Sequence, residues 1–538
     1  MAAPLTHADC YASLQRDIHS LPIEALEDAD AIHPNTSDVL ANFVEISKIS
    51  RPSEHEAEVR AFLIQEAHAK GFEHSTDDAG NLLIIVPSNI KGGESIPSVL
   101  IQSHLDIVPK VKGIDTLKDA LAFYQSNSGV MPLEWKSGSI QSKDQHNTIG
   151  ADNGSGVAIM MEYMRNPELP HPRLELLFTV EEETGLIGAT QLGFSIESRI
   201  AISLDSGAVH EALIGSIGAA RLTVNTKPIK REAVAPGQKA YSIKLSGLEG
   251  GHSGMKIGLG RANATHEATQ LALLIKEALP ELNIVSLNAG TEGTFNAIPN
   301  KFSIDIALAP EQVKKLKEVL FKFEAKLRSQ YRGIESFKKF SFVLQNNKST
   351  PTSVLNWSEL KNALLTIDSI PDGSIRNSNT NWPRNIRDWR FSSNTAFIAI
   401  DDTGLRCAFM PRFFETNSYF RFMNLVKDKM TDGLPQHDFN TLGYSPPWQP
   451  QSSSHITQLV SQNAQQQGLP LNITVADGGV EASILAQMYP DMDIVVIGAE
   501  VSNPHEESEA MPLVPLAQTI RLLDDTLQSI ISENQITP

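Results

Sequence analysis

The stretch SVLIQSHLD at residues 98–106 organises the rest of this chain. Its apolar first half predicts a buried strand, and His104 and Asp106 follow where that strand ends. Side chains two positions apart on a strand share a face, so this imidazole and this carboxylate can point the same way. Taken alone, the pair is more typical of a histidine hydrogen-bonded inside the fold than of a metal site. The downstream sequence must therefore decide between these two interpretations.

Length and charge limit the class of protein. A chain of 538 residues is too long for one hydrophobic core, so we expect two or more domains. The 63 Asp and Glu residues outnumber the 45 Lys and Arg residues, and the net charge of −18 argues against nucleic acid and against an anionic membrane surface as partners. The N-terminal stretch lacks the apolar core of a secretory signal, and no run approaches about 18 apolar residues. We therefore expect a cytoplasmic protein.

The order of the predicted elements indicates an interrupted α/β domain. Strands alternate with helices from about residue 35 to residue 217, and the same pattern returns in residues 445–538. Residues 218–444 instead mix alternating strands with long amphipathic helices. We therefore predict an α/β catalytic domain with a mixed sheet, formed by 1–217 and 445–538, with an inserted α+β lid domain at 218–444.

Possible metal ligands follow several of the predicted strands and turns. Only two cysteines are present, so a metal would be held by histidines and carboxylates rather than by thiolates. The candidates are His104, Asp152, the run Glu181–Glu183, Asp205 and His505. Two imidazoles and three carboxylates can hold two divalent ions if one carboxylate bridges them. Such nitrogen and oxygen ligands suit zinc, with manganese or cobalt as alternatives.

The motifs around these candidates resemble those of the M20 metallopeptidases, and within them those of the bacterial aminoacyl-histidine dipeptidase (Xaa-His dipeptidase) subfamily. They occur in family order and span most of the chain beyond residue 35: SHLDIVP at 103–109, IGADNGSGVA at 149–158, VEEETGLIGA at 180–189, LDSG at 204–207, SGLEGGHSG at 246–254, RANA at 261–264, FNAIP at 295–299, GYSPPWQP at 443–450 and NPHEESE at 503–509. The resemblance implies a zinc-peptidase-like catalytic domain and a lid of two subdomains.

The resemblance also implies a role for each candidate in the catalytic domain. It groups the metal ligands as two pairs joined by a bridge: His104 with Asp205, Glu183 with His505, and Asp152 between them. Glu182 would be the general base for a hydroxide that bridges the ions, and Asp106 would orient His104. The run of three glutamates leaves a shift of one residue open. The acidic cluster Glu506–Glu509 is interpreted as a solvated loop beside His505, with support of the site by Glu509 as the less favoured alternative.

Three lid residues would contact the substrate if the resemblance holds. His252 would donate a hydrogen bond to the oxyanion that forms at the scissile carbonyl. Asn296 would bind the substrate, and Arg412 would bind its free carboxylate, because a guanidinium can hold a carboxylate through two hydrogen bonds. Arg421 competes with Arg412 for this role, since residues 370–425 depart most from the family pattern. Asp477 replaces a histidine that many relatives carry.

The leading hypothesis is therefore a di-metal dipeptidase that acts on small dipeptides, with Xaa-His substrates such as β-Ala-His among the candidates. An amidohydrolase, deacetylase or carboxypeptidase acting on N-acyl amino acids is the alternative within the same family. An inactive metal-dependent peptide-binding protein is the non-enzyme alternative, although the intact Glu182 counts against it. The long insertion favours a lid histidine supplied within one chain and leaves a homodimer open.

Overall fold

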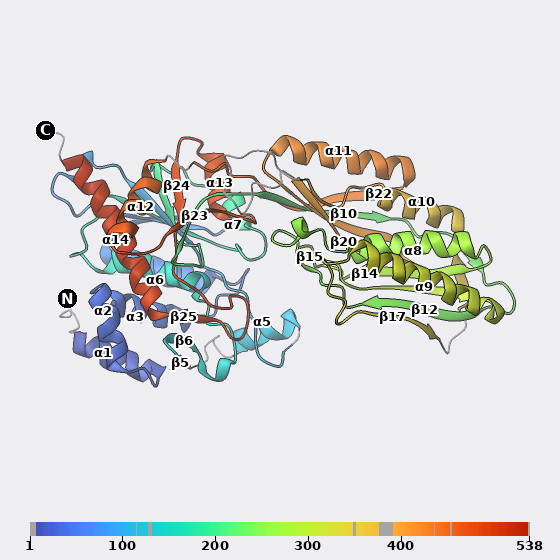
Figure 1. The fold of residues 1–538 in the computed structure, drawn as a ribbon. Helices are drawn as coiled ribbons and strands as arrows, with labels where there is room; N and C mark the ends of the chain where they lie inside the picture. The colour runs from blue at the N-terminus through green and yellow to red at the C-terminus, as the bar shows by residue number, and fades with distance from the viewer. Residues whose placement is uncertain are drawn as a thin grey trace. The chain divides into compact units, whose positions relative to one another are not determined.

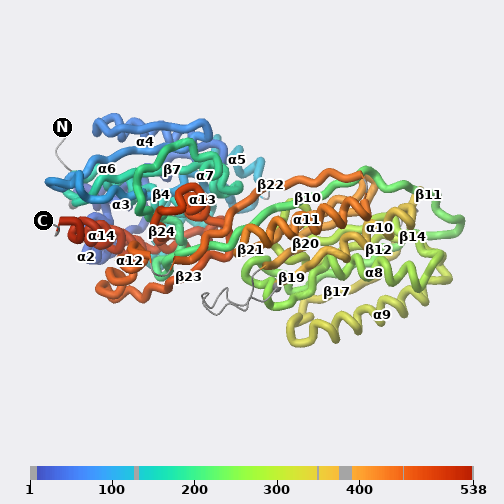
Figure 2. The backbone as a smooth tube through the Cα atoms, turned by 90° about the horizontal axis from the view of Figure 1, so that it is seen from above, coloured from blue at the N-terminus to red at the C-terminus, as the bar shows by residue number. Residues whose placement is uncertain are grey.

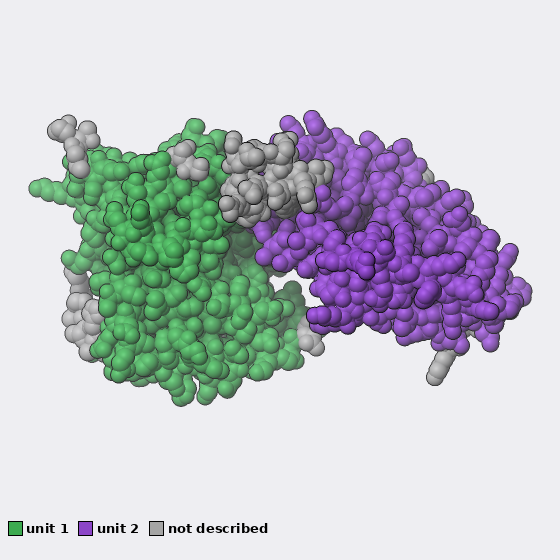
Figure 3. Space-filling view, in the orientation of Figure 1, with its two compact units in different colours: residues 1–215, 448–476, 480–538 green, residues 216–447, 477–479 purple. Residues whose placement is uncertain are grey.

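The computed structural model describes residues 7–114, 116–126, 132–347, 351–375, 391–434, 436–451 and 454–535. The chain forms two compact units (Figures 1 and 3). Unit 1 comprises Met1–Gly215, Trp448–Ala476 and Val480–Pro538, and unit 2 comprises Ser216–Pro447 and Asp477–Gly479. The predicted lid, residues 218–444, falls within unit 2.

Unit 1 is built on an eight-stranded mixed sheet, as the α/β prediction requires. In order across the sheet its strands are β2 (Glu73–Thr76), β3 (Leu82–Val86), β7 (Leu174–Thr179), β4 (Val99–His104), β8 (Ile200–Ser203), β24 (Asp493–Val496), β9 (Glu211–Ser216) and β23 (Asn472–Ala476). The central strands β7, β4, β8 and β24 run parallel. Their carboxyl ends therefore meet at one edge, where ligands bind in open α/β sheets.

Both faces of this sheet are covered, which explains the continuous apolar run of β4. Ile101 packs into the core on one face and Leu100 into the core on the other, because side chains alternate along a strand. One core receives residues of α3 (Thr36–Ser47), α4 (Ala57–Lys70), α6 (Ala151–Arg165), α12 (His455–Gln466) and α14 (Leu513–Gln535). The other receives residues of α13 (Glu481–Met488). The C-terminal elements, red in Figure 2, thus complete a body begun by the blue and cyan ones.

The polar segment 110–147 is more regular than its loop-rich sequence indicates. It contains α5 (Leu117–Ser126) and a hairpin of β5 (Leu133–Lys136) and β6 (Ser139–Ser142). The hairpin joins β1 (Ile18–His19) and β25 (Ala510–Pro512) in a four-stranded sheet. Tyr124 of α5 donates a hydrogen bond to the carbonyl of Thr148. This segment therefore packs against the chain that leads into α6.

Unit 2 is built on a nine-stranded sheet. Eight strands follow the order β17 (Ser341–Asn346), β12 (Lys239–Ser246), β16 (Phe302–Leu308), β14 (Asn283–Gly290), β20 (Phe391–Asp401), β21 (Gly404–Phe413), β10 (Gly218–Thr226) and β22 (His437–Ser445), and β19 (Gly373–Ile375) pairs with β20. One core cluster joins the sheet to α8 (Ala264–Ala278), α9 (Val313–Gln330), α10 (Trp357–Asp368) and α11 (Thr416–Gly433). The two lid subdomains that the resemblance implies therefore share one sheet and one core.

Among the described residues, no helix has an apolar stretch long enough to cross a lipid bilayer.

Candidate active site

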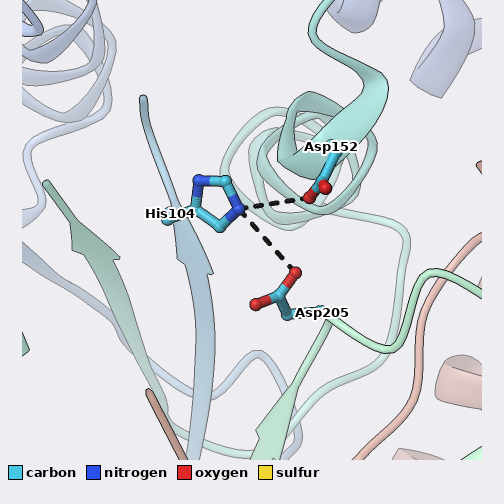
Figure 4. A group of neighbouring side chains, drawn as sticks. All are labelled: His104, Asp152 and Asp205. Atoms are coloured by element: carbon cyan, nitrogen blue, oxygen red, sulfur yellow. Dashed lines mark hydrogen bonds and ion pairs between the residues drawn. The ribbon is translucent and has the colours of Figure 1, made fainter. Parts of the chain in front are cut away.

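His104 ends β4 with its imidazole buried and one nitrogen facing two carboxylates. Its Nδ1 donates a hydrogen bond to the backbone carbonyl of Asp106 at 3.0 Å, which leaves Nε2 without a proton when the ring is neutral. Nε2 lies 3.2 Å from Asp152 Oδ1 and 3.7 Å from Asp205 Oδ1 (Figure 4). The ligand atoms of these three residues lie within 4.8 Å of one another. This group can hold a metal ion.

A second group shares Asp152 with the first. His505 Nε2 lies 3.3 Å from Asp152 Oδ2 and 2.9 Å from Glu183 Oε1. The two oxygens of Asp152 therefore face different histidines, which is the geometry that a bridging carboxylate needs. The structure thus brings together all five residues that the sequence proposed as metal ligands.

The charges of this cluster fit divalent cations. Burial raises the pKa of Asp205 well above its ordinary value, and the neighbouring Asp152 and Glu183 add to this rise. Burial likewise raises the pKa of Glu183. Glu183 Oε1 is buried, and His505 Nε2 lies 2.9 Å from it. The carboxylates repel one another, and a bound cation would relieve this repulsion. Such closely spaced oxygen and nitrogen ligand atoms suit divalent ions such as zinc or manganese.

Glu182 points into the same cluster, whereas Glu181 belongs to none of the ligand groups. Ligand atoms of His104, Glu182 and Glu183 lie within 4.8 Å of one another. Burial raises the pKa of Glu182 well above its ordinary value. Glu181 has a left-handed backbone, with a φ of 52°, and its N–H donates to Glu56 Oε1. This geometry favours the register in which Glu182 and Glu183 carry the chemistry.

Asp106 supports the site in two ways, one of which the sequence did not indicate. Its Oδ1 lies 3.4 Å from His104 Nδ1, in line with the orienting role that the resemblance implies. Its two carboxylate oxygens also accept hydrogen bonds from the N–H groups of Glu182 at 3.0 Å and Glu183 at 3.1 Å. Asp106 therefore holds the turn that presents both glutamates.

Arg51 is a supporting residue that the sequence analysis missed. Its side chain is 1% exposed, and it donates 2.6 Å hydrogen bonds to the carbonyls of Leu105 and Gly150. Leu105 follows His104 directly. Gly150 comes two residues before Asp152. One buried guanidinium thus ties together the two segments that carry these ligands, and no local pattern around Arg51 signals this long-range role.

Glu509 corrects the interpretation of residues 506–509 as a solvated loop. Its side chain is buried, and its carboxylate accepts hydrogen bonds from the N–H groups of Ile149, Gly150 and Asp152. Four residues after His505, Glu509 therefore fixes the turn that presents Asp152. The interpretation failed because a run of glutamates looks solvated, whereas the chain enters β25 directly afterwards and takes Glu509 inside.

Glu481 is a further buried carboxyl near the cluster. It accepts hydrogen bonds from Gln102 of β4 and Thr179 of β7. Burial raises its pKa to about 7. The available sequence signal is the Gly-Gly-Val-Glu stretch at 478–481, which leads into α13 and follows Asp477 directly.

His252 lies in unit 2 with its Nδ1 turned towards its own loop. It belongs to β13 (Gly251–His252), which pairs with β15 (Ala297–Ile298). The N–H groups of Gly254 and Met255 lie 3.3 and 3.4 Å from Nδ1. Nδ1 therefore accepts and Nε2 carries the proton, because burial and the charge of Arg412 lower the pKa of the imidazole. A neutral ring with a free Nε2–H can donate to an oxyanion.

Arg412 and Asn296 differ sharply in burial. Arg412 is buried on β21, and its Nη1 donates to the carbonyl of Asp477 at 2.6 Å, while its Nε has no partner in the described structure. Arg421, the competing candidate, is exposed on α11. Asn296 is exposed, and the described residues offer its side chain no hydrogen bond. Among the candidates in unit 2, Arg412 is therefore a buried guanidinium and Asn296 an exposed amide.

A family model described as Peptidase family M20/M25/M40 matches residues 100–529. The chain belongs to this family. A cytosol non-specific dipeptidase of Escherichia coli strain K12 is 28% identical over 493 residues, which cover 91% of this chain and 96% of that protein.

Solved structures of this peptidase family share the fold. An aminoacylhistidine dipeptidase from Vibrio alginolyticus superposes with a TM-score of 0.75 at 24% identity, covering 93% of this chain and 98% of that one. A tripeptidase from Staphylococcus aureus superposes with a TM-score of 0.50 at 14% identity, covering 93% and 99%. These likenesses show that the two-unit fold is that of the family's peptidases.

Proposed function

We propose that this M20 peptidase is a dipeptidase that uses two divalent metal ions, with zinc best suited to the ligands. The position of Asp152 carries the proposal, because its two oxygens each face a different histidine and each histidine has a further carboxylate beside it. The name of the E. coli relative, which aligns over nearly its whole length, supports dipeptides as the substrates.

Glu182 is the proposed general base. When bound, two divalent ions would lower the pKa of a water molecule and polarise the scissile carbonyl. Glu182 takes the proton from the attacking water and passes it to the leaving amine. Its burial favours the protonated carboxyl, so it holds a proton in transit more readily than an exposed glutamate would. Asp106 keeps this residue in place through its backbone N–H.

Residues of unit 2 are the proposed substrate contacts. His252 Nε2–H donates to the developing oxyanion, since Nδ1 is already occupied by backbone N–H groups. Arg412 pairs with the free carboxylate of the dipeptide, and Asn296 supplies an amide that no other described group uses. Pairing of Arg412 with the free carboxylate of a dipeptide would favour short peptides as substrates.

The test is hydrolysis of a panel of Xaa-His and other dipeptides, with N-acetyl amino acids as the comparison, before and after dialysis against a chelator. We expect dipeptide cleavage that the chelator abolishes and that zinc, manganese or cobalt restores. Cleavage of the N-acetyl amino acids alone would favour the deacylase alternative. Metal-dependent peptide binding without cleavage would favour the non-enzyme alternative.

The cytoplasmic location and a homodimer stay predictions. The E. coli relative is named for the cytosol, which supports the first. Sedimentation of the metal-loaded protein measures the second.

A further inference from the structure

Asn394 lies beneath the loop that carries Asn296. It is the fourth residue of β20 and is 1% exposed. Its Nδ2 donates hydrogen bonds to the carbonyl of Phe295 at 3.0 Å and to that of Ala297 at 2.9 Å. These two carbonyls flank Asn296 directly. One buried amide thus fixes the backbone on both sides of the exposed Asn296 side chain.

The same loop is joined to the segment that carries His252. The N–H of Ser253 donates to the carbonyl of Asn296 at 2.7 Å. The neighbouring pairing of His252 with Ala297 in β13 and β15 adds a second link. A displacement of the Phe295–Ala297 backbone would therefore move both proposed substrate contacts together.

The orientation of Asn394 is set from its other side. Asn263 Nδ2 lies 3.4 Å from Asn394 Oδ1 and 3.0 Å from Asp372 Oδ1. Asn263 is itself held, because it caps the N-terminus of α8 and accepts a hydrogen bond from the N–H of Thr265. Since the oxygen of Asn394 faces a donor, its amide nitrogen must face the two carbonyls.

We propose that Asn394 is a positioning residue for substrate recognition, which sets the place of Asn296 and, through the Ser253–Asn296 hydrogen bond, of His252. This inference rests on the proposed function, in which both residues contact the dipeptide. Asn394 has no contact with the substrate itself. Its effect passes through the backbone carbonyls that it holds.

The first experiment compares Asn394→Ala with Ser393→Ala. Ser393 is the neighbour on the same strand, is equally buried, and its hydroxyl has no hydrogen bond in the described structure. We expect kcat/KM for the best dipeptide to fall about 10- to 100-fold in Asn394→Ala, because two buried carbonyls lose their donor. The kcat/KM of Ser393→Ala should stay within about threefold of the parent value. This change is well below the roughly tenfold loss expected for one lost hydrogen bond. Equal values for both variants would overturn the inference.

A double-mutant cycle separates positioning from a general loss of stability. In the Asn296→Ala background one of the two positioned side chains is gone, while the backbone link to His252 stays, so adding Asn394→Ala should lower kcat/KM by less than it does in the parent. If kcat/KM of the double variant falls by the product of the two single fold-changes, Asn394 has a structural role unconnected with Asn296. Asn394→Ser keeps one hydroxyl donor, should fall between the parent and Asn394→Ala, and serves if the alanine variant does not fold.

Hydrogen–deuterium exchange tests the placement independently of activity. In Asn394→Ala, amides in residues 251–256 and 295–299 should exchange faster than in Ser393→Ala, with the rest of unit 2 unchanged. If the parent protein cleaves no dipeptide, the proposed function fails and the exchange still decides whether Asn394 holds both segments. If the parent is active and neither exchange nor kcat/KM changes, the inference alone fails.

Discussion

Around Asp152 in unit 1 the supporting side chains carry charge, whereas around Asn296 in unit 2 they are neutral amides. The buried side chains of Arg51 and Glu509 form hydrogen bonds with the backbone at and next to Asp152. Asn394 and Asn263 support the loop of Asn296 in unit 2. Both arrangements hold a loop through its backbone, but the free energy lost when a supporting side chain is removed should differ between them.

The difference follows from what each region has to hold. A buried charge that loses its partner destabilises a protein by several kcal/mol, so the supports in unit 1 tolerate little change. A buried neutral amide that loses its partner costs about 1–3 kcal/mol. We therefore expect changes in unit 1 to alter metal content and stability as well as activity, and changes in unit 2 to alter mainly the handling of substrate.

The largest effect should come from Glu182→Gln, which removes the proposed base without changing its shape. We expect kcat to fall about 10²- to 10⁴-fold, the usual contribution of a general base. Metal content, measured on the purified variant, should stay at the parent level because Glu182 is not a proposed ligand. Glu181→Gln is the matched control in the same run, and a large loss in that variant instead would shift the register by one residue.

Arg51→Met should break the support in unit 1. The substitution leaves two carbonyls without donors and removes the positive charge beside Glu509 and Asp106. We expect a loss of about 3–5 kcal/mol in the free energy of unfolding, measured by urea denaturation. Arg165→Met, which removes partly exposed ion pairs with Glu45 and Glu66, should cost about 1 kcal/mol or less. Equal costs would contradict the buried role of Arg51.

Glu481→Gln should change how stability depends on pH in the metal-free protein. The pKa of Glu481 is raised to about 7 from an ordinary 4.5, so between these values the folded protein binds a proton that the unfolded chain has released. Its contribution to stability is thus present below pH 4.5 and declines as pH rises to 7, by about 3 kcal/mol in all.

Thermal unfolding from pH 4.5 to 7.5 measures this slope. Glu56 and Glu509 have pKa values raised to about 7 as well and act in the same direction, so only the difference between the variant and the parent isolates Glu481. A difference that stays constant with pH would show that Glu481 does not titrate in this range.

The smallest effect should come from Arg412→Lys in unit 2. Lysine keeps the charge but lacks the planar fork that holds a carboxylate through two hydrogen bonds. We expect KM for dipeptides to rise about 10-fold with kcat little changed, since one charge-assisted hydrogen bond is lost. Metal content should not change. Arg421→Lys is the control, and a KM effect in that variant alone would transfer the carboxylate-binding role to Arg421.

The sequence predicted the fold class and the residues of the candidate metal cluster because their signals are local. An apolar run before His104, a glycine-rich turn at Asp152 and a strand before Asp205 each place a proposed ligand at the carboxyl end of a strand or at a helix start. The parallel sheet then brings these ends together without further information. Such features can be recognised one segment at a time.

The contacts of the supporting residues could not be predicted because their partners are remote in sequence. Arg51 reaches carbonyls 54 and 99 residues away, and Glu509 binds N–H groups more than 350 residues away. The glycines at 150 and 154 looked like turn residues, yet a Cβ at either would come closer than 3 Å to the Arg51 guanidinium. Their small size makes room for a charge that no local pattern reveals.

The insertion of unit 2 into unit 1 has a consequence for synthesis on the ribosome. Strand β24 lies between β8 and β9 in the sheet of unit 1, although the whole insertion separates it from both along the chain. The sheet of unit 1 therefore stays incomplete until residues 448–538, which supply β23 and β24, have left the ribosome. Unit 2 is almost entirely one continuous segment, and it can fold before unit 1 is complete. The polypeptide is thus expected to complete unit 2 before it completes the proposed metal cluster, because His505 of that cluster is made after all of unit 2.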